Sequence, residues 1–355
     1  MLTAPEHDGR DGQNGPDGRD GQNGRGAQKG RPMEHVHLGR SGMVVSRLCL
    51  GTLGFGPRTS EPDAHTMMDL AHEHGVNFFD TADSYGGDGA RGRTEEIIGD
   101  WFMRGVGRRD RTVLATKVYG AMGGWPNEER LSALHIKRAC DASLRRLRTD
   151  RIELYQLHHV DRRTPWEEIW EALSDLRAQG KILYVGTSNH AAWHLVKAQE
   201  RASRLGLLGL VSEQPPYSLA QRTAELEVLP ACQDYGIGVL PWSPLHRGLL
   251  SGVLRRADGV RSRGARARRA LEGMRDRVEA YEAFCAELGE DPAAVALAWL
   301  LHQPAVTAPV IGPRTAEQLV SALHARDVRL DTAALARLDA IFPGPGGAAP
   351  EAYAW

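Results

Sequence analysis

Short apolar runs alternate with longer amphipathic stretches along most of this chain, and this alternation limits the possible folds more than any other feature. The runs have the length of strands, and the stretches between them carry apolar side chains at helical spacing. Eight runs occur, at residues 48–51, 77–80, 113–117, 152–158, 182–187, 210–214, 238–242 and 308–311. Eight strands that alternate with helices in one series predict an α/β fold of the (β/α)8 or TIM barrel type.

The stretches between the runs contain candidate helices at residues 62–74, 94–104, 132–147, 165–179 and 292–301. Thr94 is expected to cap the second helix, and Asp291-Pro292 places a cap and a first-turn proline at the start of the last. An open, doubly wound sheet is the alternative fold. The glycine-bearing segment 51–56 after the first strand lacks the Gly-x-Gly-x-x-Gly spacing, and Pro57 follows it, which weakens that alternative.

Residues 1–32 differ from the rest of the chain. They are rich in glycine, and the sequence of residues 8–15 recurs at residues 17–24. Because bulky apolar side chains are almost missing, burial cannot offset the entropy of ordering this segment, and we expect a disordered tail. A flexible tether and translation that begins at Met33 are alternatives. Residues 35–38 and 43–46 predict a short hairpin at the start of a single domain, residues 33–355.

Composition bears on partners and compartment. The formal net charge of −1 favours neither nucleic acid nor an anionic membrane. No apolar run approaches the roughly 18 residues that span a bilayer, and the N-terminus has no apolar signal segment. The four cysteines, Cys49, Cys140, Cys232 and Cys285, lack metal-ligand spacing. These features predict a cytoplasmic protein with reduced thiols and without a metal, nucleic-acid or membrane partner; no oligomeric state is predicted.

Four polar residues lie at or just after the ends of the second, third and fourth runs: Asp80, Tyr85, Lys117 and His158. A barrel of parallel strands collects such strand ends at one mouth, where active sites are built. Tyrosine has a pKa of about 10 in isolation, and a nearby lysine ammonium lowers it. An aspartate can hold the lysine, and a histidine can orient the substrate oxygen. The set predicts a general acid for carbonyl reduction.

Each residue alone also fits an ordinary structural role. Asp80 could be a helix cap, and Lys117 could be a solvated strand end. His158 is followed by His159, so the residues alone leave open which ring faces the mouth. What favours a site is the occurrence of four suitable residue types, in order, at three consecutive strands.

The chain resembles the aldo-keto reductase superfamily, in the branch that includes the voltage-gated potassium channel β subunits, over about residues 33–355. The resemblance rests on residues 75–82 with Tyr85-Gly86, and on residues 155–158, 184–189 and 242–245. It implies NADPH-dependent carbonyl reduction with Tyr85 as proton donor, supported by Lys117 and Asp80. It also implies that His158, and not His159, contacts the carbonyl group.

The resemblance implies where NADPH would lie. Ser188, Asn189 and Gln214 match positions that bind the nicotinamide carboxamide, and the ring of Tyr217 would stack under the nicotinamide. Gly312, Arg314 and Gln318 match the adenosine-phosphate site, where Arg314 would favour NADP over NAD. The other implied cofactor residues are Gly51, Thr52, Trp242, Ser243, Pro244, Leu245, Gly248 and Leu249. Ser321, Ala322 and Leu53 depart from the pattern of the branch.

Within the superfamily the chain resembles actinomycete reductases of deoxysugar pathways. These reduce an NDP-4-keto-6-deoxyhexose, typically at C3, in antibiotic biosynthesis. The resemblance includes residues 157–162, 164–168, 243–246, 248–252, 312–315, 341–345 and 350–352. A general aldehyde or ketone reductase, a polyketide side-chain ketoreductase and a non-catalytic NADP-binding regulatory subunit are alternatives. The arginine-rich segment 247–269 predicts either a clamp on a diphosphate group or a solvated loop.

Overall fold

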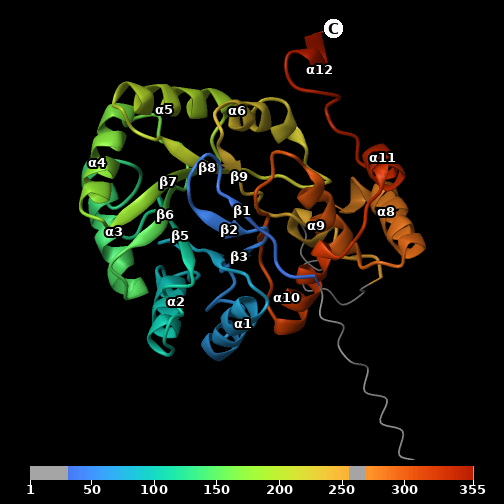
Figure 1. Ribbon diagram of the computed structural model, residues 1–355, viewed down its shortest axis with the longest axis horizontal. Helices are drawn as coiled ribbons and strands as arrows, with labels where there is room; N and C mark the ends of the chain where they lie inside the picture. Colours follow the sequence, from blue (N-terminus) through green and yellow to red (C-terminus); the bar gives the residue numbers. More distant parts are fainter. Residues whose placement is uncertain (1–30, 256–268, 270, 355) are drawn as a thin grey trace, which may run out of the picture. The chain divides into compact units, whose positions relative to one another are not determined.

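Eight parallel strands form a sheet that curls into a barrel (Figure 1). Their order in the sheet is β10, β3, β4, β5, β6, β7, β8 and β9. The bounds are β3 (Cys49–Gly51), β4 (Phe78–Asp80), β5 (Val113–Val118), β6 (Ile152–Leu157), β7 (Ile182–Ser188), β8 (Leu210–Gln214), β9 (Gly238–Val239) and β10 (Val310–Ile311). A 2.8 Å bond from Val310 N to Pro241 O joins the two ends of the sheet. The expected (β/α)8 barrel is confirmed.

The computed structural model describes residues 31–255, 269 and 271–354. The expected tail, residues 1–32, thus lies outside the described residues except for Arg31 and Pro32. Five arginines of the arginine-rich segment also lie outside them: Arg256, Arg261, Arg263, Arg266 and Arg268.

Helices cover the outside of the sheet, and one follows each strand (Figure 1). They are α1 (Glu61–Glu73), α2 (Arg93–Met103), α3 (Ala133–Leu147), α4 (Trp166–Ala178), α5 (Ala192–Arg204), α6 (Val228–Asp234), α9 (Pro292–His302) and α10 (Ala316–Leu323). Between β9 and α9 the chain adds α8 (Arg275–Leu288), and after α10 it adds α11 (Thr332–Ile341) and α12 (Glu351–Ala354). Short 3-10 turns occur at η1 (Thr223–Glu225), η2 (His246–Gly248) and η3 (His324–Arg326).

Some predicted element ends were wrong. Strands β9 and β10 are shorter than the expected runs, because Pro241 and Pro309 have no N–H with which to continue a ladder. Thr94 does not cap α2. That helix begins at Arg93, after Gly92 in the left-handed region with φ 88°, and the buried Thr94 hydroxyl donates to Phe55 O at 3.1 Å. Asp291 caps α9 as expected.

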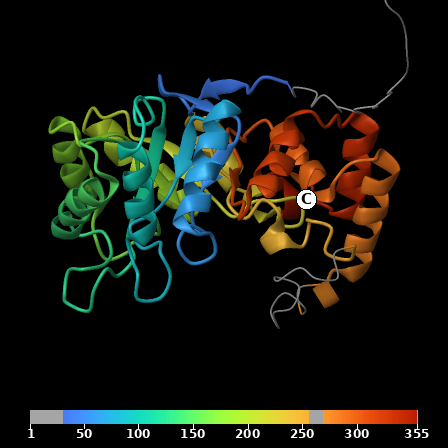
Figure 2. The ribbon, with the colours of Figure 1, turned by 90° about the horizontal axis from the view of Figure 1, so that it is seen from below.

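A two-stranded hairpin closes one end of the barrel. Its strands are β1 (His35–His37) and β2 (Val44–Ser46), and Leu38 and Val45 join an apolar cluster with strand residues such as Cys49 and Phe78. Figure 2 shows the hairpin at one end of the barrel and the long loops at the other. Because the strands point away from the hairpin, their C-terminal ends meet at the end that the hairpin leaves open.

Candidate active site

Asp80, Tyr85, Lys117 and His158 come together at the open end of the barrel. Asp80 ends β4, Lys117 lies near the end of β5, His158 directly follows β6, and Tyr85 is in the loop after β4. The Lys117 ammonium donates to Asp80 Oδ2 at 2.6 Å, to Thr81 O at 3.0 Å and to the Tyr85 hydroxyl oxygen at 3.3 Å. The rings of Tyr85 and His158 meet edge to face, with their centroids 5.8 Å apart. The structure thus brings the four predicted residues into one cluster.

Lys117 is a fully buried cation with a buried counterion. Burial alone lowers the pKa of its ammonium, but the charge of Asp80 and the oxygen of Tyr85 outweigh burial, so the net pKa lies above the ordinary value. An unpaired charge in this place would be strongly disfavoured. Lys117 therefore stays positively charged across the neutral pH range, directly beside the Tyr85 oxygen.

Two glutamine side chains hold the other oxygen of Asp80. Gln156 Nε2 donates to Asp80 Oδ1 at 2.9 Å, and Gln214 Nε2 donates to the same atom at 3.0 Å. The sequence argument missed Gln156 as a site residue. The sequence did indicate this role, because Gln156 lies two residues before His158 and alternate residues of a strand share one face. Gln214 was expected at the nicotinamide; with its NH2 group on Asp80, its amide oxygen is the atom that remains for a ligand.

Tyr85 is a neutral phenol at neutral pH. Burial raises its pKa above 10, and the positive charge of Lys117 offsets only part of that rise. The expected direction was the opposite, a pKa brought down by the lysine. The lysine acts as expected, but the low polarity around the ring opposes it more strongly. The hydroxyl therefore holds its proton until a developing negative charge on a substrate oxygen draws it away.

His158 is a neutral imidazole. Burial, and then the positive charge of Lys117, lower its pKa to about 3. Its backbone is fixed on both sides, because its N–H donates to Val118 O at 3.0 Å and its carbonyl accepts from Asn189 Nδ2 at 3.1 Å. The neighbouring His159 instead packs on Tyr119, with the ring centroids 5.5 Å apart. His158 can therefore hydrogen-bond a substrate oxygen beside Tyr85 but carries no spare proton at neutral pH.

Ser188, Asn189 and Trp242 form a hydrogen-bonded chain at the ends of β7 and β9. Asn189 Nδ2 donates to Ser188 Oγ at 3.0 Å, Ser188 Oγ donates to Gln214 O at 2.8 Å, and Trp242 Nε1 donates to Asn189 Oδ1 at 3.0 Å. Asn189 has a φ of 61°, in the left-handed region, which Asn tolerates better than most residues. A carboxamide that binds these side chains must share or replace bonds that they already make.

Tyr217 follows β8 but is only 1% exposed. Its hydroxyl donates to Glu225 Oε1 at 2.7 Å, and its ring packs on Trp299 with the centroids 5.6 Å apart. The expected stacking face is therefore covered in this structure.

The loop after Trp242 has an unusual backbone. Ser243, His246, Arg247 and Gly248 have φ values of 57°, 45°, 58° and 95°. Non-glycine residues rarely adopt such values, and strained positions of this kind cluster at ligand sites. The Ser243 hydroxyl oxygen accepts from Arg247 N at 3.0 Å, which stabilises the turn. Five expected cofactor residues lie on this loop: Ser243, Pro244, Leu245, Gly248 and Leu249.

Arg314, in the segment between β10 and α10, lies near a second arginine, Arg58. Arg314 precedes the Thr315 cap of α10, and Arg58 comes from the loop after β3, where Thr59 Oγ1 donates to Arg314 O at 3.1 Å. Partial burial, and then the charge of Arg58, lower the pKa of Arg314. Among the described side chains no carboxylate forms an ion pair with either guanidinium. Together with the N-terminus of α10, this makes a region of unmatched positive charge that suits a phosphate group.

Gly312, Gln318, Gly51 and Thr52 complete the predicted cofactor set. Gly312 is exposed, and a Cβ built on it would meet no atom within 4 Å, so a ligand can approach the backbone there. Gln318 Oε1 accepts from Arg314 N at 3.0 Å. Thr52 donates from its N–H and its hydroxyl to Asp80 O, at 3.0 and 2.9 Å. Its polar groups therefore fasten β3 to Asp80.

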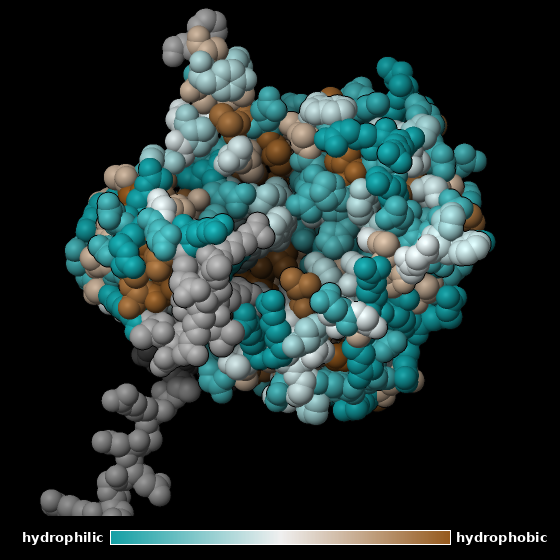
Figure 3. Space-filling model, turned by 180° about the vertical axis from the view of Figure 1, so that it is seen from behind, coloured by the Kyte–Doolittle hydropathy of each residue, from teal (hydrophilic) through white to brown (hydrophobic). Residues whose placement is uncertain are grey.

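A pocket of about 350 Å³ opens directly beside Tyr85. It is lined by Leu53, Ser84, Tyr85, Gly86, Gly87, Asp88, Arg91, Gly120 and Ala121. Leu53 is 59% exposed, and Arg91 donates to Ala121 O. Figure 3 shows the open face of the barrel, which is hollowed near its centre with apolar side chains along the hollow.

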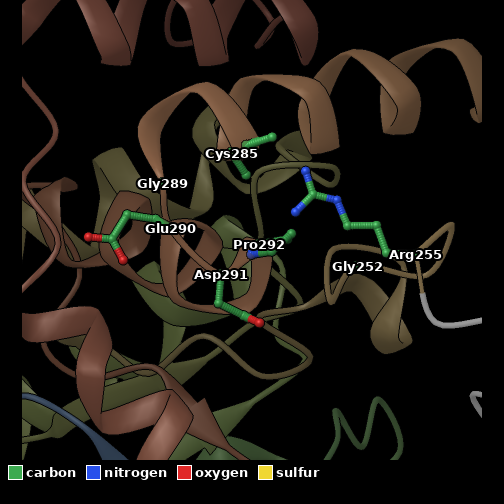
Figure 4. Close-up of a pocket in the computed structure, with 8 residues that line it drawn as sticks. Gly252, Arg255, Cys285, Gly289, Glu290, Asp291 and Pro292 are labelled. Carbon is green, nitrogen blue, oxygen red and sulfur yellow. The ribbon is translucent and has the colours of Figure 1, made fainter.

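A second pocket of about 420 Å³ lies between α8 and α9 and contains none of the strand-end residues (Figure 4). Its lining includes Arg255, Cys285, Glu290 and Asp291. Although it is larger, the chemistry of the strand ends faces the pocket at Tyr85. Across residues 31–255, 269 and 271–354, no group of three or more His, Cys, Asp and Glu side chains could hold a metal ion. None of the helices described is long and apolar enough to cross a membrane.

Comparisons with known proteins show which families and relatives the chain is similar to. A sequence model described as the Aldo/keto reductase family matches residues 47–342. An uncharacterized oxidoreductase of Bacillus subtilis, YrpG, is 53% identical over 330 residues, which cover 91% of this chain and 100% of the relative. A protein of Oryza sativa named probable voltage-gated potassium channel subunit beta is 35% identical over 311 residues, 83% of this chain and 92% of the relative. Versiconal hemiacetal acetate reductase of Aspergillus parasiticus is 33% identical over 328 residues, which cover 84% of this chain and 94% of the relative.

Proposed function

Because this chain belongs to the aldo/keto reductase family, and is therefore an NAD(P)-dependent oxidoreductase, we propose that it is an NADPH-dependent carbonyl reductase whose proton donor is Tyr85. The observation that carries the proposal is the hydrogen bond from the Lys117 ammonium to the Tyr85 hydroxyl oxygen, beside an open pocket. A phenol that faces both a pocket and a fixed positive charge is suited to protonate an oxygen that gains negative charge.

The four residues take different parts in this proposal. Tyr85 donates the proton, and Lys117 stabilises the phenolate that remains. Asp80 keeps Lys117 charged and in place, helped by the two glutamines on its second oxygen. His158, neutral at working pH, donates a hydrogen bond from its ring N–H to the carbonyl oxygen and so orients it. The low pKa of His158 favours Tyr85 over His158 as the acid.

The residues present fit a dinucleotide with an additional phosphate. When bound, the cofactor supplies the hydride. Arg58 and Arg314 would neutralise the 2′-phosphate of NADPH, and the N–H groups at the start of α10 would add to this charge. The strained loop 243–249 would contact the pyrophosphate, and Ser188, Asn189 and the amide oxygen of Gln214 would hold the carboxamide. Tyr217 would have to expose its ring to stack on the nicotinamide, since it is covered in this structure.

For the substrate we propose a keto group, at C3, of an NDP-4-keto-6-deoxyhexose in antibiotic biosynthesis. The resemblance in the loops after β6 and β9 supports this proposal, as does Arg91 in the lining of the Tyr85 pocket, where a cation could meet a diphosphate. The exposed Leu53 at the same pocket and the relative named versiconal hemiacetal acetate reductase favour the alternative, a reductase of more apolar ketones or aldehydes, including polyketide side chains.

Steady-state oxidation of NADPH with keto-sugar nucleotides, aromatic ketones and simple aldehydes, assayed side by side, tests both ideas. A kcat/KM far higher for one class identifies the substrate class. No oxidation with any activated aldehyde or dicarbonyl compound would exclude the reductase. That result would favour a cofactor-binding regulatory subunit, the reading raised by the relatives named as potassium channel subunits.

We also propose that residues 33–355 fold as one domain and that the protein works in the cytoplasm. The four cysteines support the second point, because all are buried and free. Cell fractionation that finds the protein outside the cytoplasmic fraction would contradict the location. Limited proteolysis that leaves a stable fragment much shorter than residues 33–355 would contradict the single domain.

A further inference from the structure

Asp83, two residues before Tyr85, is a buried acid without an ion-pair partner among the described residues. Its side chain is 0% exposed. Neither carboxyl oxygen has a hydrogen-bond partner of good geometry within the part of the chain that the structure describes, although the amide and hydroxyl of Ser84 lie near enough to favour its ionised form. An ionised carboxylate in such surroundings is strongly disfavoured unless a cation pairs with it.

The cations around Asp83 are already paired with other acids. On α3, Arg146 Nε lies 2.7 Å from Glu95 Oε2, and Glu95, on α2, is itself fully buried. The other Glu95 oxygen accepts from the Thr116 hydroxyl at 2.6 Å. On β5, Lys117 pairs with Asp80. Three buried carboxyl groups thus face two cations.

The remaining titratable groups near Asp83 supply no positive charge. Tyr155 on β6 faces it, and burial raises the pKa of that phenol well above its ordinary value, so it is neutral. Tyr85 in the same loop is neutral as well. Burial, and then the negative charge of Glu95, raise the pKa of Asp83 to about 8, while Arg146 and Ser84 act weakly in the other direction. The charge count and the burial agree that Asp83 holds the proton.

We propose that Asp83 is a positioning residue for the proton donor, that it stays a neutral carboxylic acid while the enzyme works, and that its ionisation at alkaline pH weakens Tyr85 as an acid. The proposal rests on the proposed role of Tyr85. A negative charge at Asp83 would oppose the effect of Lys117 on the Tyr85 oxygen.

Backbone hydrogen bonds hold the loop that carries Asp83 and Tyr85. Asp83 N donates to Lys117 O at 3.1 Å, Tyr85 N donates to Ala82 O at 3.2 Å, and Gly92 N donates to Tyr85 O at 2.9 Å. In addition, a Cβ on Gly86 would lie 1.9 Å from Ala90 O, so the turn after Tyr85 packs closely against the backbone at residue 90. A charge that appears on Asp83 therefore acts on Tyr85 at a fixed separation.

Asp83→Asn tests the proposal, because an amide is neutral and has the shape of the protonated acid. At neutral pH we expect kcat and KM to stay within about a factor of two of those of the parent. As the pH rises through 8, turnover should fall in the parent and persist in the variant until Tyr85 itself ionises. In a Glu213→Gln background, which removes the other buried carboxyl group with a raised pKa, the infrared carbonyl stretch of a protonated carboxylic acid should be present at neutral pH and be lost when Asp83→Asn is added.

Stability provides a readout that does not depend on activity. Since the folded protein holds this proton more tightly than the unfolded chain, the parent loses stability relative to Asp83→Asn as the pH rises from 3.8 to 8. The Tm of Asp83→Asn should exceed that of the parent by a margin that grows across this window. Asp100→Asn is the matched control, because Asp100 lies on the same helix as Glu95 but pairs with the exposed Arg148 at 2.8 Å. Asp100→Asn should leave the fall in turnover at alkaline pH unchanged.

Glu95→Gln is a second variant with the opposite expectation. It releases Arg146 to pair with Asp83, so Asp83 should ionise at neutral pH, the infrared band of the Glu213→Gln background should disappear, and turnover should fall at a lower pH than in the parent. The proposal is wrong if Asp83→Asn loses turnover and Tm at neutral pH, or if the infrared band of the Glu213→Gln background survives when Asp83→Asn is added. If Tyr85→Phe keeps full turnover, the proposed function fails instead, whereas the infrared band and the Tm difference still report the proton on Asp83.

Discussion

The Lys117 ammonium lies 3.3 Å from the hydroxyl oxygen of Tyr85 and 5.0 Å from the centre of its ring. It therefore approaches the edge of the phenol on which negative charge would develop. Because both side chains are buried, water screens this interaction little. The geometry makes Lys117 the main stabiliser of a Tyr85 phenolate, and this leads to one prediction about each of the two residues.

Tyr85→Phe should keep cofactor binding and lose most turnover. The substitution removes only the hydroxyl, so the packing around the ring is retained, whereas loss of a general acid lowers kcat by about 10² to 10⁴. Cofactor affinity is measured by fluorescence titration and turnover by NADPH oxidation. Tyr353→Phe, on the exposed α12, is the control and should change neither. Unchanged turnover in Tyr85→Phe would refute its role as the acid.

Lys117→Met and Asp80→Asn should each destabilise the fold, and their effects should not add. Removing one partner of a buried ion pair leaves the other charge unmatched, which costs about 3–5 kcal/mol of unfolding free energy. The double variant leaves no unmatched charge and should be less destabilised than the sum of the two single variants. Denaturant unfolding of all four proteins measures this coupling. Additive effects would mean that the 2.6 Å contact contributes no coupling.

The position of this cluster could be predicted from the sequence because its signals are local. Each residue ends, or closely follows, a short apolar run, and the alternation of runs and helices places all strand ends at one mouth. The structure confirmed the barrel. It moved the ends of several elements, notably at Thr94, Pro241 and Pro309, where a glycine cap or a missing N–H overrode the expected pattern. It also contains helices for which no bounds were predicted, such as α5 and α8.

What could not be predicted depends on contacts between distant segments. Gln156 and Gln214 meet on one oxygen of Asp80 although they are 58 residues apart in the chain, and no local pattern specifies that. The burial of Tyr217 depends on Trp299 and Glu225, which come from other elements. The missing counterion of Asp83 follows from pairs that its neighbours make. Such features require the packed structure.

Arg314→Ala should weaken NADPH binding more than NADH binding, and Arg58→Ala should act in the same direction. Each guanidinium would interact with the 2′-phosphate, which NADH lacks, and hydrogen bonds to a charged group contribute about 1.5–3 kcal/mol, or roughly ten- to a hundredfold in affinity. Affinities for both cofactors are measured at low and high salt. Arg337→Ala, which removes an exposed pair with Glu287, is the control. Equal losses for NADPH and NADH would remove the phosphate argument.

Glu213→Gln should make the protein more stable at alkaline pH. Burial raises the pKa of this carboxyl group to about 7, and one of its oxygens has no hydrogen-bond partner within the described ranges. The folded state thus holds a proton that the unfolded chain releases, and the parent loses stability as the pH rises from 4.5 to 7. Glutamine removes this loss, so the variant should gain in Tm relative to the parent across that window. A constant Tm difference at every pH would contradict the assignment.

His158→Gln should flatten the acid side of the stability profile. Burial and Lys117 lower the pKa of His158 to about 3, so below pH 6.5 the unfolded chain binds a proton that the folded protein does not bind. The parent therefore loses stability as the pH falls from 6.5 toward 3. One such group contributes at most about 1.4 kcal/mol per pH unit, which glutamine abolishes. His37→Gln, in the exposed hairpin, should leave the slope unchanged. If His158→Gln keeps the parent slope, His158 is already protonated in the fold, and the assignment of a neutral imidazole beside Tyr85 is wrong.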